Sequence, residues 1–212
     1  MQHTHGMSGK SRKEEYAEAT RAALVDVARG LFSSPERGFA AVSIEEIVQG
    51  ARVTRGALYH HFDDKQALFR AVLEGIESEI ADRMQAAAEK ETHPWEQVRA
   101  ACQAYLDACL ERDVQRIVVL DAPSILGWHT WCEIDRRYGL GVLQERLAAA
   151  LAAQLIDPQP LEPVALLILG TLNTGGRVIA EAKQSTEARK QVGATIDRLL
   201  SGLRKTKGRA RS

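Results

Sequence analysis

The sequence predicts an all-α protein, in which an N-terminal three-helix unit with a helix-turn-helix precedes a larger helical C-terminal domain. The first observation is periodicity: in "RAALVDVARGLF" the residues Leu24, Val27, Ala28 and Leu31 fall on one helix face. The second is that no segment alternates polar and apolar residues as half-buried strands do. The third is composition, since 45% hydrophobic and 26% charged residues over 212 positions are typical of a soluble chain with a sizeable core.

Four helices are expected in the N-terminal third. The first covers about 16–33. A short second helix begins at Ser43, because Ser43 and Glu46 have the spacing of a capping box. A third begins at Thr54, which is a good N-cap residue. A long fourth helix covers about 64–90, capped by one of the two aspartates before it.

The C-terminal helices follow the same period, with prolines at or near their starts. They are expected at about 94–111, 113–120, 123–138, 140–155, 162–183 and 186–203. The chain divides into a disordered lead-in over 1–14, a first domain over 15–75, a second over 76–203 and a basic disordered tail over 204–212.

Bulk properties exclude several classes of protein. The lead-in has no apolar run of a signal peptide, and no window of eighteen uncharged apolar residues predicts a membrane span. Three cysteines without a close pair argue against a disulfide framework or zinc ribbon and fit a reducing cytoplasm. The net charge is zero, with ten basic and ten acidic residues in 1–75. A nucleic-acid partner would therefore be bound by a compact surface and not by general attraction.

Two short helices joined by Ala51-Arg52-Val53 form the outline of a helix-turn-helix, whose second helix enters the DNA major groove. Thr54 and Tyr59 offer hydroxyls for phosphates, and the guanidinium of Arg55 matches guanine O6 and N7. Gly56 lets the helix approach closely. Each also has an ordinary structural explanation: Arg55 as a solvated side chain, Gly56 as a packing requirement, and Tyr59 as part of the core.

The stretch "VSIEEIVQGARVTRGALYHHFDDKQALFRAVL" resembles the homeodomain-like DNA-binding domain of the TetR family of bacterial transcriptional repressors, also called TetR/AcrR-type regulators. The run G-A-L-Y-x-H-F-x-x-K is specific, and the resemblance covers about 17–75. It implies a helix-turn-helix over 43–62. It also implies DNA contacts by Ser43, Thr54, Arg55, Gly56, Tyr59, His60, His61 and the phosphate-binding Lys65. Arg52 departs from the family pattern, because many members have Gly in this turn, where φ is positive. It either strains the turn or adds a phosphate contact.

The resemblance also implies a homodimer, built as a four-helix bundle from the last two long helices of each chain. Leu166, Leu169, Leu172 and Ile179 make the first of these helices unusually apolar, and Gly170, Thr174 and Gly175 would let helices pack closely. Burial of the same residues within one protomer is the alternative. Two recognition helices would then meet half-sites one DNA turn apart, roughly 34–36 Å.

The middle of the chain is the expected site for a small-molecule effector. Aromatic and polar residues there predict an apolar pocket with a few polar groups, lined by Trp95, Cys102, Tyr105, Trp128 and Trp131. Core packing of the same aromatics is the alternative. The net charge of −5 over 76–203 favours a cationic or neutral ligand.

The expected function is that of a cytoplasmic repressor that binds a near-palindromic operator and is released when an effector favours the wrong half-site spacing. Three other interpretations remain: an activator, a helical dimer scaffold without operator binding, and an enzyme using His129 and Cys132. No cofactor or metal is expected. His60 and His61 lie next to Asp63 and Asp64, but adjacent helical residues point about 100° apart, so the two histidines cannot face one ion.

Overall fold

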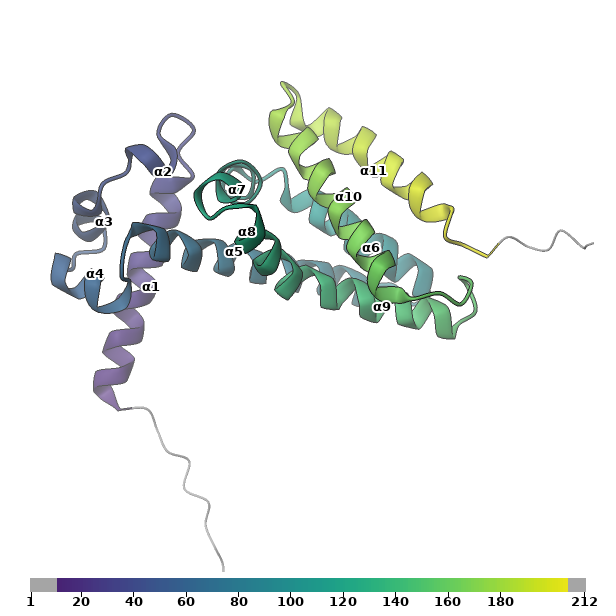
Figure 1. Ribbon diagram of the computed structural model, residues 1–212, viewed down its shortest axis with the longest axis horizontal. Helices are drawn as coiled ribbons and strands as arrows, with labels where there is room; N and C mark the ends of the chain where they lie inside the picture. Colours follow the sequence, from purple (N-terminus) through teal and green to yellow (C-terminus); the bar gives the residue numbers. More distant parts are fainter. Residues whose placement is uncertain (1–10, 206–212) are drawn as a thin grey trace, which may run out of the picture.

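The computed structural model describes residues 11–205, so most of the predicted lead-in and most of the basic tail lie outside the described residues. Within this range the chain is helical and forms no β-strand, which confirms the all-α prediction. Figure 1 shows the N-terminal helices gathered at one end and α10 and α11 at the other, with α5 leading from the first group into the rest. The elements are α1 (Arg12–Phe32), α2 (Gly38–Ala41), α3 (Ile44–Gly50), α4 (Arg55–His61), α5 (Lys65–Glu89), α6 (Pro94–Ala108), the π-helix η1 (Val114–Asp121), α7 (Ala122–Ile125), α8 (Trp128–Asp135), the π-helix η2 (Arg136–Leu140), α9 (Gly141–Ala152), α10 (Leu161–Glu181) and α11 (Ser185–Ser201).

Helix α1 begins earlier than predicted. Ser11 and Glu14 form a capping box, in which the Glu14 amide donates to Ser11 Oγ at 3.3 Å and the Ser11 amide donates to Glu14 Oε2 at 2.8 Å. The prediction of a disordered lead-in is therefore wrong for residues 11–14. The cap was readable in the sequence as Ser-x-x-Glu, but no apolar run follows it, because the first turns of α1 are mostly exposed.

The helix-turn-helix has the predicted outline. Ser43 caps α3 in the expected box with Glu46, and the Thr54 hydroxyl accepts from the Ala57 amide at 3.1 Å to cap α4. Arg52 lies in the turn with φ +56°, which confirms that a non-glycine residue holds the left-handed conformation there. The four-residue α2, which the sequence did not predict, fills part of the connection between α1 and α3.

The pair α3–α4 is stabilised by helices α1 and α5. Ile47 and Leu58 are fully buried from the two short helices, and Phe62 follows them into the core. From the supporting helices the same core takes Leu24, Ala28, Phe32, Leu68, Phe69 and Val72. Burying large apolar side chains between elements that are too short to be stable alone fixes their mutual angle.

Helix α5 connects the two domains. Asp64 caps it by accepting from the Ala67 amide at 2.7 Å, as one of the two predicted caps. It packs on α1 in the N-terminal domain and on α6 in the C-terminal domain. Near the junction Arg29 of α1 makes ion pairs of 2.6 Å with both Glu79 of α5 and Asp113, which precedes η1.

The boundaries of the middle helices differ from the prediction. The expected helix over 123–138 is interrupted at Gly127, whose φ of +82° only glycine adopts without strain. The break that was expected near residue 139 does not form, because α8, η2 and α9 continue one another through a π-helical segment. A π-bulge inserts residues without ending the helix, so periodicity alone places the boundary wrongly.

Helices α10 and α11 lie side by side along one flank of the C-terminal domain (Figure 1). By length and composition alone, α10 is apolar enough to cross a membrane, a property that core helices of soluble proteins share. Its residues Leu169, Leu172 and Ile179 are buried against the protomer's own helices. They are therefore core residues and not part of the exposed face that was predicted for a dimer. The large exposed apolar residues of this helix pair are instead Leu167 and Val178 on α10 and Leu199 on α11.

The described part of the basic tail is ordered by backbone pairing. Arg204 forms an isolated antiparallel bridge with Ile156, and the Lys205 amide donates to the Leu155 carbonyl at 2.8 Å. The prediction of a disordered tail is wrong for these two residues. Residues 206–212 lie outside the described range.

Candidate functional site

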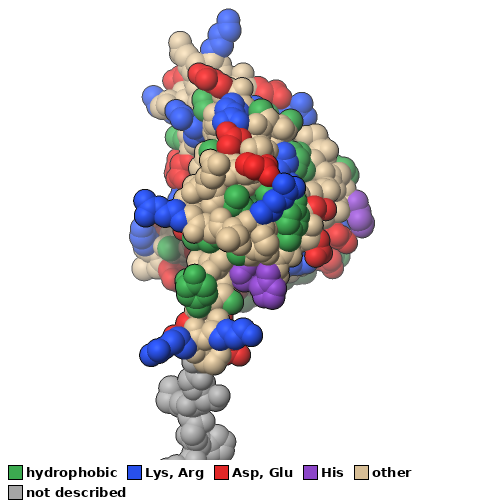
Figure 2. Space-filling model, turned by 90° about the vertical axis from the view of Figure 1, so that its left-hand side faces the viewer, with side chains coloured by type: hydrophobic (Ala, Val, Ile, Leu, Met, Phe, Trp, Pro, Cys, Tyr) green, Lys and Arg blue, Asp and Glu red, His purple; other side chains and the backbone are tan. Residues whose placement is uncertain are grey.

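The outward side of α4 carries Thr54, Arg55, Gly56 and Tyr59, and we call these four residues the reading surface. All four are exposed, while Leu58 of the same helix is fully buried. The explanation that places Tyr59 in the core is wrong, because 44% of its surface is exposed. Figure 2 views this end of the molecule and shows basic and acidic side chains interspersed, without a broad basic patch.

Gly56 has no packing reason within the protein. A Cβ atom built there would meet only Thr54 Oγ1, at 3.8 Å, so an alanine would fit the free protein. Because glycine within a helix costs about 1 kcal/mol relative to alanine, its presence needs another cause. The open space above Gly56 suits close approach by an external partner.

The guanidinium of Arg55 is already engaged by its neighbours. It donates to Glu45 Oε1 of α3 at 2.7 Å and lies 5.6 Å from the centre of the Tyr59 ring. The hydrogen bond with Tyr59 and the charges of Glu45 and Tyr59 raise the pKa of Arg55, which stays cationic. Both partners of the ion pair are more than half exposed, so a phosphate or a base can displace the carboxylate at low cost. Sequence reasoning missed Glu45, which lies in the first turn of α3 and meets Arg55 across the helix-turn-helix.

Lys65 differs from its predicted role. Its ammonium donates to the backbone carbonyls of Phe39 and Val42, both at 2.9 Å, and lies 4.2 Å from the centre of the Phe39 ring. Burial lowers the pKa of Lys65. The structure thus shows this lysine fixing the α2–α3 connection onto α5. One of its three donors remains for a phosphate, and that contact stays a prediction.

The other predicted contacts occupy the rim of the helix-turn-helix. Ser43 is exposed, but its hydroxyl is 2.9 Å from Glu46 Oε2 within the capping box, and Arg52 is exposed in the turn. His60 is exposed, whereas His61 is half-buried beside it. Burial, and then the charges of His60 and Arg21, lower the pKa of His61. At neutral pH His61 therefore lacks a full positive charge to offer a phosphate.

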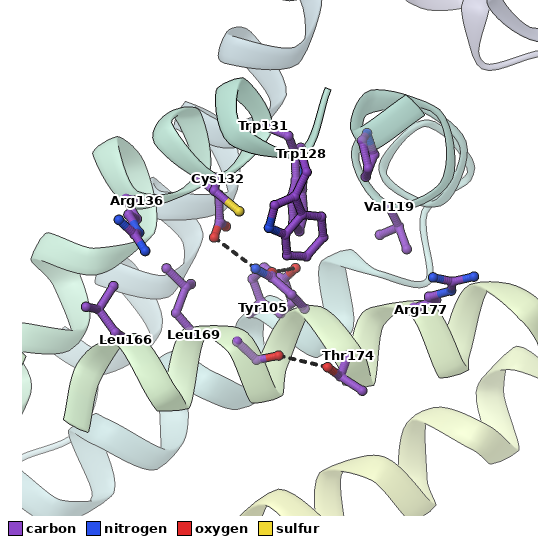
Figure 3. Close-up of a pocket in the computed structure, with 14 residues that line it drawn as sticks. Tyr105, Val119, Trp128, Trp131, Cys132, Arg136, Leu166, Leu169, Thr174 and Arg177 are labelled. Carbon is purple, nitrogen blue, oxygen red and sulfur yellow. Dashed lines mark hydrogen bonds between the residues drawn. The ribbon is translucent and has the colours of Figure 1, made fainter. Parts of the chain in front are cut away.

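A second candidate site is a cavity of about 630 Å³ in the C-terminal domain. Figure 3 shows Trp128 and Trp131 from α8 above Tyr105, with Leu166, Leu169 and Thr174 of α10 along the opposite wall. Three of the five predicted pocket residues, Tyr105, Trp128 and Trp131, line this cavity. The rest of its wall is formed by Val119, Pro123, Cys132, Asp135, Arg136, Gly170, Asn173 and Arg177.

Trp95 and Cys102 do not line the cavity, so their prediction as pocket residues is wrong. Trp95 is 2% exposed beneath the guanidinium of Arg204, 5.8 Å from its ring centre. Cys102 is fully buried, and burial raises its pKa to about 12. Both lie on α6 with Tyr105 but closer to the start of the helix, where they are buried in the core.

A hydrogen-bonded chain of three side chains forms one wall of the cavity. Tyr105 donates from its hydroxyl to Asn173 Oδ1 at 2.7 Å, and Asn173 Nδ2 donates to Asp135 Oδ2 at 2.8 Å (Figure 3). Asp135 is only 5% exposed, and burial raises its pKa to about 6. Glu77 of α5 is also buried, and burial together with the charge of Asp135 raises its pKa to about 8.

These polar residues were missed by sequence reasoning, although a signal existed. Glu77 stands between Leu73 and Ile80 on the apolar face of α5, where an acidic residue is out of place. Asp135 follows Trp128 and Trp131 at the spacing of one helix face. An acidic residue at a core position in the sequence predicts a buried ionisable group, and such groups are typical of functional sites.

The geometry does not support a His129–Cys132 catalytic pair. His129 Nε2 lies 3.3 Å from Glu133 Oε1, and its side chain is 90% exposed. Burial, and then the charge of Asp135, raise the pKa of the Cys132 thiol. A cysteine nucleophile requires the opposite shift.

Comparison with known proteins identifies both domains. A model of the N-terminal domain of bacterial regulatory proteins of the tetR family matches residues 24–72, and a tetracyclin repressor-like C-terminal domain matches 95–203. The transposon Tn10 TetC protein of Escherichia coli is 30% identical over 80% of this chain and 82% of its own length. The regulator AcrR of Shigella flexneri is 43% identical over 36% of this chain and 34% of its own.

Solved structures give the same result. A TetR-family regulator from Pectobacterium atrosepticum is 35% identical, with a TM-score of 0.79 over 94% of this chain and all of that one. RolR, solved with its ligand resorcinol, shares the fold at 22% identity, with a TM-score of 0.68 over 88% of this chain and 89% of its own. Because a family model covers half of the chain and a relative matches most of its length, this protein belongs to the TetR family of bacterial transcriptional regulators.

Proposed function

We propose that this regulator is a repressor that binds a near-palindromic operator as a homodimer and is released by a small molecule in the cytoplasm. The observation that carries the DNA-binding part is the reading surface around Gly56. A helical glycine without an internal neighbour sits between a forked donor, Arg55, and a phenol, Tyr59. This arrangement suits a helix that enters a major groove, with Arg55 directed at a guanine.

The dimer is supported by the outer face of α10 and α11. Two shallow grooves of about 310 and 260 Å³ follow this helix pair. Leu167 is 73% exposed, Leu199 59% and Val178 50%, and they project from the same two helices. Exposed leucines beside apolar grooves favour covering by an identical face, which forms a two-fold interface. A dimer then fixes the distance between two reading surfaces.

The segment η1–α7 is suited to couple the cavity to the reading surface. On one side Val119 and Pro123 line the cavity. On the other side Asp113 pairs with Arg29 of α1, and the Ile125 carbonyl accepts from the Gln66 side chain of α5 at 2.7 Å. Figure 1 shows α7 between the N-terminal helices and α10. A ligand that shifts this segment would change the orientation of the DNA-binding domain. This requires that the ligand binds the shifted and unshifted conformations with different affinity.

The proposal is tested by footprinting the protein on the DNA upstream of its own gene, followed by fluorescence anisotropy with the protected sequence. In that assay Arg55→Ala is expected to weaken operator binding by about 1–3 kcal/mol and to relax the preference at one base position. An equal loss on all sequences would show that Arg55 meets only phosphates. Absence of any protected site would overturn the DNA-binding proposal, and a reporter gene under the same operator separates repression from activation.

A further inference from the structure

We propose that the cavity between α6, α8 and α10 takes an organic cation, an ammonium group carried on an aromatic or other apolar body. This inference names the class of effector and rests on the proposed function of this cavity. It follows from the carboxylate of Asp135, which is buried at the cavity wall, and from the rings around it.

The carboxylate of Asp135 is buried at the cavity wall without a buried positive partner. Asp135 and Glu77 are 5% and 3% exposed, and neither makes an ion pair among the described residues. Asp135 Oδ2 accepts from Asn173, but no described group donates a hydrogen bond to Oδ1. Glu77 does not line the cavity, and its Oε1 is buried without a hydrogen-bond partner in the described chain. A carboxylate that is shielded from water and half-satisfied attracts a cation strongly.

Two arginines also line the cavity and would oppose a cation. Arg177 is engaged with Glu181 at 2.8 Å, and its side chain is 70% exposed. Arg136 is exposed too and follows Asp135 directly in the chain. Their guanidinium groups lie in solvent, where the dielectric constant is high and salt screens their charges. The charge of Asp135 is inside the protein, so it acts more strongly on a ligand in the cavity than the rim arginines do.

The rings of the cavity suit the body of such a ligand. The Trp128 and Trp131 centroids are 4.9 Å apart at 44°, and Tyr105 lies below them (Figure 3). Trp128 is 68% exposed, so one indole face is free in the described structure. Indole faces attract ammonium groups through their negative quadrupole, and a carboxylate next to them adds full charge. The hydrogen bonds from Tyr105 through Asn173 hold that carboxylate in place.

The test compares three naphthalene probes of similar size by isothermal titration calorimetry without DNA. They are naphthylmethylammonium, neutral naphthalenemethanol and anionic naphthoate. We expect the ammonium to bind at least about ten-fold more tightly than the alcohol, and the naphthoate to bind most weakly. Equal or tighter binding of the alcohol or the naphthoate would overturn the proposal, and so would a failure of the ammonium to bind.

Variants assign the preference to the cavity. Asp135→Asn keeps an acceptor for Asn173, and it is expected to abolish the preference for the ammonium while binding of the alcohol remains. Glu133→Gln, an exposed carboxylate on the same helix, is the matched control and leaves the preference unchanged. Should Asp135→Asn fail to fold, Trp128→Leu removes an exposed ring and is expected to weaken the ammonium more than the alcohol. An unchanged preference in Asp135→Asn or Trp128→Leu places the binding elsewhere.

A pH series gives an independent readout. The affinity for the ammonium is expected to rise as pH rises through about 6, where Asp135 loses its proton, while the affinity for the alcohol changes little. The charged and titratable groups around this carboxylate are Glu77, Tyr105, Cys109, Arg136 and Cys132. A flat pH profile for the ammonium would contradict a role for Asp135.

Binding and switching fail separately in these experiments. Ammonium binding that leaves operator affinity unchanged would disprove release by this ligand, while the cation site stands. Operator release by a neutral or anionic compound, together with no ammonium preference, would disprove the cation site and leave the proposed repressor intact.

Discussion

The reading surface and the cavity use polar side chains in opposite ways. At α4, Thr54, Arg55 and Tyr59 end in solvent, and Arg55 is held by exposed groups, the carboxylate of Glu45 and the side chain of Tyr59. In the cavity, Tyr105, Asn173 and Asp135 come from three helices, 68 and 38 residues apart in sequence, and are shielded from water. The first site is completed by a partner from outside. The second keeps the carboxylate of Asp135 inside the protein, where Asn173 and Tyr105 hold it in place.

The pKa values express this contrast. At the exposed site Arg55 is cationic, and its neighbours Tyr59 and Glu45 raise its pKa further. At the buried site the pKa of Asp135 rises to about 6 and that of Glu77 to about 8. Arg55 therefore keeps its charge near neutrality, whereas Asp135 in the cavity titrates at about pH 6.

The largest expected effect concerns the face that joins two reading surfaces. The double variant Leu167→Glu/Leu199→Glu places charges on the proposed interface of α10 and α11, and it is expected to give monomers in light scattering. Operator affinity should then fall by at least about 100-fold, because two linked half-site contacts become independent. Leu110→Glu, at another partly exposed leucine, is the control. A variant that stays dimeric would show that the exposed face serves another purpose.

The second prediction tests the buried carboxyl group of Glu77. Folded Glu77 has a pKa of about 8 against an ordinary 4.5, so between these values the folded state keeps a proton that the unfolded chain has released. Its stabilisation is full below about 4.5 and is lost as pH rises through 8, so the free energy of unfolding falls across this window. Glu77→Gln is expected to remove this slope, on the order of 2–4 kcal/mol, in urea unfolding at several pH values. Glu89→Gln, exposed on the same helix, should leave the slope intact.

The third prediction separates folding from DNA binding at Gly56. Gly56→Ala is expected to stabilise the protein by up to about 1 kcal/mol, because the methyl group fits the open helix surface. The same methyl group should weaken operator binding by about 1 kcal/mol or more through overpacking against DNA. Gly75→Ala, exposed on α5 with no atom within 4 Å of the added Cβ, should stabilise the protein without an effect on binding. Unchanged operator affinity in Gly56→Ala would mean that DNA does not approach this point.

The smallest expected effect concerns the partner of Arg55. Glu45→Gln frees the guanidinium and removes a negative charge from the DNA-facing side. Operator affinity should rise by a few-fold, consistent with an exposed ion pair of about 0–1 kcal/mol. Glu36→Gln removes an equal charge in the loop after α1 and is the control for net charge. If Glu45→Gln weakened binding instead, Glu45 would itself contact a base, and the carboxylate would belong to the reading surface.

Local signals were sufficient for the DNA-binding domain. The capping box at Ser43, the N-cap at Thr54 and the run from Gly56 to Lys65 each depend on residues that are close in sequence. These fix helix starts and faces regardless of what packs around them. The same locality explains why positive φ at Arg52 was foreseen. Even in this domain the sequence does not predict the position of the Lys65 ammonium, because its carbonyl partners are 23 and 26 residues away.

What the sequence by itself determined is the helical class, the helix-turn-helix with its outward residues, and the presence of aromatics in a second domain. The tertiary structure alone decided which of those aromatics face the cavity: Trp128 and Trp131 do, and Trp95 does not. It also decided that Leu172 belongs to the core while Leu167 faces outward. The physical reason is that an apolar helix has more than one face that could be buried. Which face is buried depends on the helices that pack against it. The burial of the carboxyl groups of Asp135 and Glu77 is decided in the same way, because the energy of such a group depends on its distance from water and not on its position in the chain.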